Sequence, residues 1–366
     1  MLGPRALSKN KMTRVIRAKV VGAGGYGGVG ITELLTSHPQ ARIAALVDVE
    51  NVGAPISQVY PHLRGFCDQV IVDAADPSAQ APADVAFMAT PDGVGMQLAP
   101  QALEKGEKVV DYSGDFRFNS AEAYTAYATR IGRSPQHASP QLLAEAVYGL
   151  PELHRREIGP QTRLVGNPGC FAVSCLLGLS PAVARGVVEP GTLICDCKTG
   201  VSGAGKKPSP TFHYPARYDQ MNAYKLAGHQ HVCEIERELT LLAGREQTVT
   251  FTAQAVPVCR GIMSTLYATL RQPLAEADVA AAYRDFYRDS AFVRIFPSDA
   301  AIGTMDVRGT NYCNLVVSVD ARAQRLRVVS YIDNLVKGQA GSALQNMNLL
   351  FGLPENMGLD RPGIYP

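Results

Sequence analysis

Cys170 follows a sharp turn in the sequence and is a candidate nucleophile. Asn167, Pro168 and Gly169 precede it, and an apolar run over residues 171–177 follows. Because proline cannot continue a helix and glycine permits a tight bend, we expect the chain to turn here and a buried helix to begin near the cysteine. Free N–H groups and the positive end of that helix dipole would stabilise a thiolate. A small cysteine packed in a hydrophobic core fits the local sequence equally well.

A thiolate nucleophile needs a partner that moves protons, and histidine does this best near neutral pH. Among the seven histidines, only His229 and His231 form a close pair, just ahead of a helix expected at 233–243. Both rings would face the same side of an extended segment. The sequence offers no third metal ligand beside them, so we expect no metal site. Surface or helix-capping histidines are the alternative interpretation.

Two further kinds of segment could bind anions. Residues 198–207 form a loop of small residues that ends in two lysines, where backbone N–H groups and an ammonium group could surround a phosphate. No hydroxyl residue follows Lys206, so this is not the phosphate loop of a nucleotide hydrolase. Arg117, shortly after a predicted strand, and Arg260 could each bind a carboxylate or a phosphate. An ordinary loop and ordinary surface charges are equally good interpretations.

The elements that would position these groups begin with a strand at 15–21, which runs into the glycine-rich loop 22–28. A helix at 29–37 and a strand at 42–47 complete a βαβ unit. Glycines between the strand and the helix let a dinucleotide pyrophosphate approach the backbone and the helix N-terminus. The order of strand, loop, helix and strand therefore predicts a dinucleotide-binding site.

The rest of the pattern predicts an α/β fold with two domains. Strands at 85–89 and 108–112, around a helix at 94–104, continue a mostly parallel sheet, and helix and loop follow over 119–160. After Cys170, longer strands that alternate in polarity predict an α+β domain, whose antiparallel sheet could pack against a partner subunit. Its strands are expected at 192–197, 248–258, 264–270, 315–319 and 325–332, and the later helices at 233–243, 274–288 and 341–350.

Composition excludes several classes of protein. The 366 residues, 46% of them hydrophobic, suit two compact domains. A net charge of +2 gives no field that would attract nucleic acid or an anionic membrane. No apolar stretch approaches the ~20 residues that span a bilayer. Eight cysteines without a CxxC pair fit a reducing cytosol better than a disulfide framework or a zinc cluster. Residues 1–19 are basic and lack acidic groups, so we expect a disordered leader or an early start site ahead of Met12.

A dinucleotide site, a helix-terminal cysteine, a histidine pair and anion-binding loops together indicate one reaction class. A thiolate attacks an activated carbonyl to form a thioester, which a nicotinamide hydride then reduces. From Val20 to about Leu359, seven segments in the right order resemble the N-acetyl-γ-glutamyl-phosphate reductase family, which is related to aspartate-semialdehyde dehydrogenase. These segments are 22–28, 111–117, 148–152, 167–170, 202–206, 229–235 and 333–338.

The resemblance implies NADPH-dependent reductive dephosphorylation of N-acetyl-γ-glutamyl phosphate to N-acetylglutamate semialdehyde, in arginine biosynthesis in the cytoplasm. Cys170 would be the acylated nucleophile and His231 the acid/base, with His229 nearer the substrate. The residues expected at the cofactor are Gly22, Ala23, Gly24, Gly25, Tyr26, Gly27, Gly28, Ser202, Gly203 and Asn334. Those expected at the acyl-phosphate substrate are Ser113, Arg117, Asn167, Lys206 and Arg260.

The family's fold further implies how the chain is divided. An N-terminal Rossmann-type dinucleotide-binding domain would comprise residues 18–168 and 338–366, because the C-terminal helix returns to it, and residues 1–17 would be a leader. Residues 169–337 would form the catalytic and dimerisation domain. Since subunits of the family pair through the sheets of these domains, we expect a homodimer or a homotetramer.

Several residues depart from the family's pattern. Gly24 replaces a serine, residues 171–173 replace Tyr-Pro-Thr, and Cys233 replaces a proline. Asp48 and Glu50 follow the second strand, where the family often carries serine and arginine for the 2′-phosphate of NADP. Acidic residues at this place favour NAD, which is therefore an alternative cofactor. Two alternative functions are a reductase of an α-aminoadipyl phosphate derivative in lysine biosynthesis and a catalytically silent nucleotide-binding protein.

Overall fold

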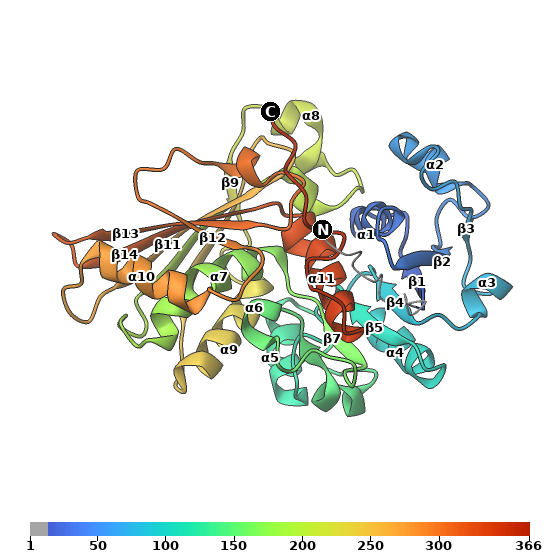
Figure 1. The fold of residues 1–366 in the computed structure, drawn as a ribbon, viewed down its shortest axis with the longest axis horizontal. Coiled ribbons are helices and arrows are strands. Elements are labelled where there is room, and N and C mark those ends of the chain that lie inside the picture. Colours follow the sequence, from blue (N-terminus) through green and yellow to red (C-terminus); the bar gives the residue numbers. More distant parts are fainter. Residues whose placement is uncertain (1–13) are drawn as a thin grey trace, which may run out of the picture.

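Two seven-stranded sheets lie side by side, with helices packed on their faces (Figure 1). The computed structural model describes residues 14–366. All strand pairs of the first sheet run parallel, in the order β3-β2-β1-β4-β5-β7-β6, which confirms the predicted parallel sheet. Its strands are β1 (Ile16–Val21), β2 (Ala41–Val47), β3 (Ile71–Val72), β4 (Val85–Met88), β5 (Lys108–Asp111), β6 (Val147–Tyr148) and β7 (Leu164–Gly166).

Helices alternate with these strands along the chain. They are α1 (Tyr26–Thr36), α2 (Ile56–Val59), α3 (Pro77–Gln80), α4 (Gly95–Glu104), α5 (Ala121–Arg130) and α6 (Pro151–His154). Helix α1 begins at Tyr26 instead of residue 29 because Gly27 and Gly28 enter its first turn. A Cβ at Gly28 would lie 2.1 Å from the carbonyl oxygen of Gly22, so only glycine lets the helix and the loop approach so closely.

Strand β1 begins at Ile16, inside the segment 1–17 that we expected to precede the fold. The Ile16 side chain is buried in the core of the first domain, and its pairing with Ala41 extends the parallel ladder to the start of the strand. Residues 1–13, including Met12, lie outside the described part of the chain.

The second sheet is mixed, where the sequence pattern predicted an antiparallel one. Its order is β12-β13-β14-β11-β8-β10-β9, and the pairs β8–β10 and β12–β13 are parallel. Alternating polarity reveals one buried face of a strand but carries no information about its direction relative to a neighbour. The strands are β8 (Leu193–Thr199), β9 (Asn222–Tyr224), β10 (Val249–Ala255), β11 (Ile262–Thr269), β12 (Val293–Phe296), β13 (Cys313–Asp320) and β14 (Arg325–Ile332).

Three helices cover one face of this sheet: α7 (Cys170–Ala184), α9 (His231–Ala243) and α10 (Glu276–Phe286) (Figure 1). Strand β11 shows how the two faces of the sheet differ. Leu266 and Ala268 are fully buried in the core beneath the helices, whereas Met263 and Tyr267 are half-buried on the other face. The short helix α8 (Tyr214–Arg217) lies in the long connection between β8 and β9.

The C-terminal helix α11 (Gly341–Leu350) packs against α1 of the first domain. Ala343, Leu344 and Met347 belong to the same hydrophobic core as strands β1 and β4. A π-helical turn, Val336–Ala340, leads from β14 into α11. The chain therefore crosses from the second sheet back to the first immediately beside the start of α7.

Candidate active site

A cavity of about 520 Å³ lies between the two domains and brings most of the predicted site residues together. It is bounded by the glycine loop, the ends of β2, β4 and β5, the first residues of α7 and α9, the loop after β8 and the turn before α11. The predicted residues that line it are Gly22, Gly24, Gly25, Tyr26, Gly27, Arg117, Cys170, Ser202, Gly203, Lys206, His231 and Asn334. Ala23 and Gly28 belong to the same loop but are buried behind it.

Cys170 is the first residue of α7, as predicted, and is partly exposed to the cavity. The helix begins here because Gly169 takes an extended conformation at its N-cap, while the apolar residues 171–183 are all buried. Burial raises the pKa of the Cys170 thiol to about 11, although the N–H of Phe171 and the Arg117 guanidinium both lower it. The helix N-terminus therefore favours the thiolate, as expected, but desolvation outweighs this effect.

His231 lies directly on the turn that precedes the cysteine. A Cβ added at Gly169 would be 2.2 Å from the Nε2 atom of His231, so the imidazole occupies the space that any side chain there would need. The ring is nearly fully buried, and burial together with the neighbouring His229 places its pKa well below the usual value. His231 is therefore a neutral imidazole that can accept a proton.

His229 lies behind His231 and does not line the cavity. Its ring packs among Phe171, Tyr224 and Phe251, and its centroid is 4.9 Å from that of His231. Its Nδ1 accepts a hydrogen bond of 3.2 Å from the backbone N–H of His231. Because α9 starts at His231, the two rings do not face the cavity together, and His231 is the one of the pair that lines it.

Arg117 lines the cavity, but its guanidinium is already bound. It donates to the carbonyl oxygens of Tyr112 (2.6 Å) and Asn167 (2.8 Å) and pairs with Glu234 at 3.2 Å. Glu234 is a buried carboxylate that the sequence did not single out. It also accepts from the Gly169 N–H at 2.7 Å. Since Glu234 follows His231 by one turn of α9, one helix end contacts the nucleophile's turn at two points. The feature of the sequence that could have identified Glu234 is a charged residue on the buried face of α9.

Three residues expected at the substrate do not line this cavity. Ser113 is buried and donates to Asp111 at 2.5 Å. Asn167 is fully buried, and its amide group donates to the carbonyl oxygen of Gln339 at 3.0 Å. Arg260 pairs with Asp333 at 3.1 Å and borders a separate groove. Short polar side chains beside a turn form hydrogen bonds with nearby protein groups as readily as with a ligand, and local sequence does not distinguish these roles.

The glycine loop is held by the end of strand β2. The Gly24 N–H donates to Asp48 Oδ2 at 2.7 Å, and Asp48 Oδ1 accepts from the N–H groups of Val49 and Glu50. The hydroxyl of Tyr60 donates to the Gly24 carbonyl oxygen at 2.8 Å. Asp48 therefore holds the glycine loop in place by a hydrogen bond, and it lines the cavity together with Glu50.

Ser202 and Asn334 meet on the opposite wall. The amide nitrogen of Asn334 donates to the Ser202 hydroxyl at 2.9 Å, and its amide oxygen accepts from the Gly261 N–H at 2.7 Å. Gly338 touches the nucleophile from the same side, because a Cβ there would be 2.7 Å from the Cβ of Cys170.

Four polar atoms of residues that line the cavity are buried without a hydrogen-bond partner: Thr90 Oγ1, the Tyr112 hydroxyl, Gln339 Oε1 and His231 Nδ1. Burying such groups unpaired is costly, so they fit a ligand that supplies the partners. Thr90 and Tyr112 closely follow β4 and β5, and ligands bind at the carboxyl ends of parallel strands, so these two could have been predicted. Nothing in the local sequence marks Gln339.

Within residues 14–366, no group of three or more His, Cys, Asp or Glu side chains is arranged to hold a metal ion. No helix in that part of the chain is long and apolar enough to cross a membrane.

Comparisons with known proteins agree with this architecture. A family described as "Semialdehyde dehydrogenase, NAD binding domain" matches residues 17–160, and one described as "Semialdehyde dehydrogenase, dimerisation domain" matches residues 170–334. An aspartate semialdehyde dehydrogenase II from Vibrio cholerae shares the fold, with a TM-score of 0.68 and 17% identity over 92% of this chain and 98% of that one. The aspartate semialdehyde dehydrogenase from Candida albicans, solved with NADP, has a TM-score of 0.65 and is 16% identical. The match covers 92% of this chain and 98% of that one.

Sequence relatives are much closer. A protein of Desulforamulus reducens named N-acetyl-gamma-glutamyl-phosphate reductase is 42% identical over 96% of this chain and 100% of its own length. A protein of Syntrophobacter fumaroxidans with the same name is 44% identical over 94% of this chain and 98% of its own. Identity at this level over whole chains, in two domains of the matching type, means that the chain belongs to the N-acetyl-gamma-glutamyl-phosphate reductase family of oxidoreductases.

Proposed function

We propose that the protein reduces N-acetyl-γ-glutamyl phosphate to N-acetylglutamate semialdehyde and phosphate with NADPH, as a step of arginine biosynthesis in the cytoplasm. The observation that carries this proposal is that Cys170 and His231 meet at one cavity with the glycine loop, in a chain whose full-length relatives bear that enzyme's name.

The cavity fits a nicotinamide dinucleotide. Gly22, Gly24 and Gly25 expose backbone where α1 begins, which suits a pyrophosphate. The unpaired atoms of Thr90, Tyr112 and Gln339 lie in the wall of the same cavity and suit the hydroxyl and amide groups of the remaining cofactor. NADPH bound here supplies the hydride that reduces the acyl group.

Cys170 acts first. Neutral His231 takes the thiol proton, and the sulfur attacks the acyl carbonyl carbon of the substrate. A C–S bond forms, the C–O bond to phosphate breaks, and His231 passes its proton to the departing phosphate. The neutral His231 imidazole and the neutral Cys170 thiol suit this sequence of steps, because the proton moves from the thiol to the imidazole only when the sulfur attacks a bound substrate.

The thioester on Cys170 is then reduced to the aldehyde. When its C–S bond breaks, the sulfur leaves as a thiolate and recovers a proton from water through His231. The Arg117 guanidinium and the N–H groups of the first turn of α7 face this centre and stabilise negative charge on the sulfur.

The test is NADP⁺ reduction with N-acetylglutamate semialdehyde and phosphate, the reverse direction, for the wild type, Cys170→Ser and Cys259→Ser. Cys259 is an exposed thiol outside this cavity and serves as the matched control. We expect activity in the wild type and in Cys259→Ser, and a loss of at least about a thousandfold in Cys170→Ser, because a hydroxyl is a far weaker nucleophile.

Two outcomes would reject parts of this proposal. Turnover of an aminoadipyl semialdehyde derivative but not of the acetylglutamyl compound would move the substrate to the lysine pathway. Full activity of Cys170→Ser would reject the thioester route, and cofactor binding without any activity would leave a silent nucleotide-binding protein.

We further propose that the second sheet pairs with a second copy of the chain, as a homodimer or homotetramer. The match of residues 170–334 to a dimerisation domain supports this, as does the half-buried face of β11 opposite the helices, which carries Met263 and Tyr267.

A further inference from the structure

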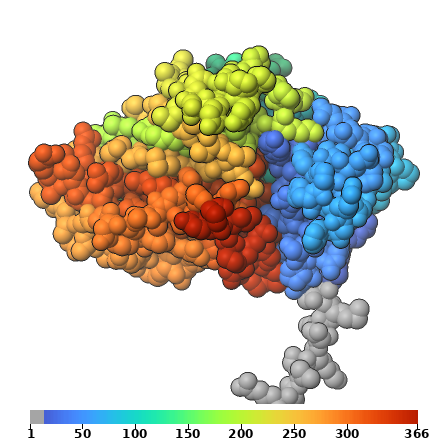
Figure 2. All heavy atoms as spheres, turned by 90° about the horizontal axis from the view of Figure 1, so that it is seen from above, coloured from blue at the N-terminus to red at the C-terminus, as the bar shows by residue number. Residues whose placement is uncertain are grey.

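Charged residues of both domains meet in the cavity wall beside the end of β2. Glu50 follows β2 in the first domain, and Lys206 and Lys207 belong to the loop after β8 of the second. The Nζ atoms lie 3.5 Å (Lys206) and 3.8 Å (Lys207) from the Glu50 carboxylate. In Figure 2 the yellow-green segment that contains this loop lies against the blue first domain.

These lysines lie beside the glycine loop rather than beside the nucleophile. Lys206 Nζ is 3.5 Å from the place where a Cβ at Gly24 would stand, next to the Asp48 carboxylate. Lys206 was expected at the acyl-phosphate substrate, and its ammonium group is instead held at the β2 end of the cavity.

The β2 end is where a Rossmann domain meets the 2′ position of the adenine ribose. An acidic residue there usually accepts hydrogen bonds from the ribose hydroxyls of NAD. Asp48 is already committed, because its two oxygens accept from three backbone N–H groups. Glu50 is paired with two lysines, so both carboxylates are less available to a ribose than those of an NAD site.

We infer that Lys206 and Lys207 bind the 2′-phosphate of NADPH, so that the second domain supplies the charge which the end of β2 lacks. The inference rests on the proposed function for the identity of the cofactor. A 2′-phosphate dianion carries twice the charge of Glu50 and attracts both ammonium groups more strongly. Glu50 holds the lysines in place until that phosphate arrives and competes with it for them.

Adenosine 2′,5′-bisphosphate and AMP differ only in the 2′-phosphate and therefore test this contact without catalysis. Their dissociation constants are measured by calorimetry for the wild type, Lys206→Gln, Lys207→Gln, Glu50→Gln and the control Lys105→Gln, a lysine that contacts Gln80 away from the cavity. We expect each cavity lysine variant to weaken the bisphosphate about tenfold and AMP less than twofold, and Glu50→Gln to tighten the bisphosphate. Lys105→Gln should change neither ligand.

Equal losses for both ligands would overturn the inference, because the lysines would then contact the 5′-phosphate. A wild type that binds the bisphosphate no more tightly than AMP would overturn it as well, in favour of NAD. Failure of the acetylglutamyl substrate to turn over would reject the proposed function but would leave the contrast between the two adenosine ligands intact, so the two failures are distinguishable.

Discussion

Two opposite charges beside Cys170 influence how readily its thiol ionises. The Arg117 guanidinium lowers its pKa and the Glu234 carboxylate raises it, although burial has the largest effect. Because Arg117 and Glu234 form an ion pair at 3.2 Å, much of the cation's influence on the sulfur is cancelled. Glu234 therefore accepts from the Gly169 N–H and adds to the effect of burial, which is the main cause of the raised pKa of Cys170.

The alkylation of Cys170 by iodoacetamide should report this balance. Below a pKa of about 11 the thiolate fraction rises with pH, so the rate in the free protein should increase about tenfold per pH unit between about pH 7 and about pH 10. Glu234→Gln keeps an oxygen acceptor for the Gly169 N–H and removes the negative charge, so its profile should shift to lower pH. Mass spectrometry of the Cys170 peptide gives the rates.

Glu157→Gln is the control for that experiment, because Glu157 is an exposed carboxylate whose partner is His154. A wild-type rate that levels off below about pH 8 would mean that Cys170 is a resting thiolate after all. An unchanged profile in Glu234→Gln would show that the carboxylate acts only through its hydrogen bonds.

Gly169 should be intolerant of any side chain. In Gly169→Ala the new Cβ would meet the His231 imidazole at 2.2 Å, so the ring has to move away from the sulfur. We expect kcat to fall about a hundredfold with KM for the cofactor little changed, because small misplacements of a catalytic group have effects of that size. Gly159→Ala is the matched control, since nothing lies within 4 Å of a Cβ there. Normal turnover of Gly169→Ala would mean that His231 does not act from this position.

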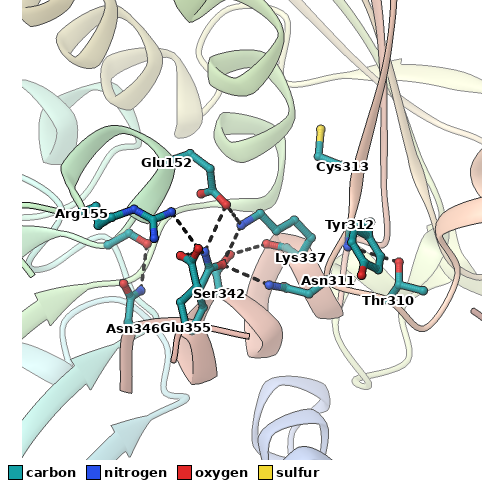
Figure 3. Close-up of polar contacts among 12 residues, drawn as sticks. Glu152, Arg155, Thr310, Asn311, Tyr312, Cys313, Lys337, Ser342, Asn346 and Glu355 are labelled. Carbon is teal, nitrogen blue, oxygen red and sulfur yellow. Dashed lines mark hydrogen bonds and ion pairs between the residues drawn. The ribbon is translucent and has the colours of Figure 1, made fainter. Parts of the chain in front are cut away.

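At the scale of elements, a buried ion pair anchors the turn that presses on Cys170. Lys337 of the π-helical turn is fully buried, and its ammonium donates to Glu152 of α6 at 2.7 Å (Figure 3). The ammonium also donates to Gln345 of α11 at 2.8 Å. Ser342 donates to the Lys337 carbonyl oxygen at 2.6 Å and supports the wide turn. The next residue, Gly338, contacts Cys170. The ion pair therefore anchors the turn that contacts the nucleophile, and π-helical turns are frequent at functional sites.

Removing one member of this pair should lower the free energy of unfolding more than removing both. Burial opposes the ionisation of Glu152, but Lys337 outweighs it and the pKa of Glu152 is lowered. Lys337→Met would leave that carboxylate buried alone, and we expect a loss of about 3–5 kcal/mol in the free energy of unfolding. Glu152→Gln should also destabilise, and the double variant should recover part of the loss. Urea unfolding of the four proteins measures the coupling. Strictly additive losses would mean that the two side chains do not act as a pair.

The whole molecule places its cavity between two domains, and we propose that one face of the second sheet pairs with another subunit. The cavity takes the glycine loop from the first domain and Cys170, His231 and Ser202 from the second, so the distances between reacting groups depend on how the domains pack. Helix α11 belongs to the core of the first domain, and the turn before it touches the nucleophile, which fixes that packing from a second side.

Charges on the uncovered face of β11 should prevent subunit pairing. Met263→Glu combined with Tyr267→Glu places two carboxylates on that face, and burying them in an interface would be costly. We expect the oligomer to dissociate to a smaller species in sedimentation velocity experiments. Ala277→Glu with Ala281→Glu, on the exposed side of α10, is the control and should leave the assembly intact. An unchanged sedimentation coefficient in the β11 variant would locate the interface elsewhere.

Much of this protein is determined by local sequence. Short-range sterics leave few backbone conformations for two segments. These are the glycine loop between a β-branched strand and a helix, and the turn Asn167-Pro168-Gly169 before the cysteine. The parallel first sheet and the start of α7 at Cys170 were predictable for that reason. Strands of two or three residues, such as β3 and β7, carry too little pattern to be recognised.

The tertiary structure alone decided which charges meet. Arg117 and Glu234 are distant in the sequence, as are Glu50 and Lys206, and only the packing of the two domains pairs them. The same packing put His229 behind His231 and joined Asn167 to the turn before α11 by a hydrogen bond. It also kept the Cys170 thiol protonated, because the pKa of a group follows its desolvation and its neighbours in space. Sequence specified the nucleophile, and the surrounding fold specified its protonation state and its partners.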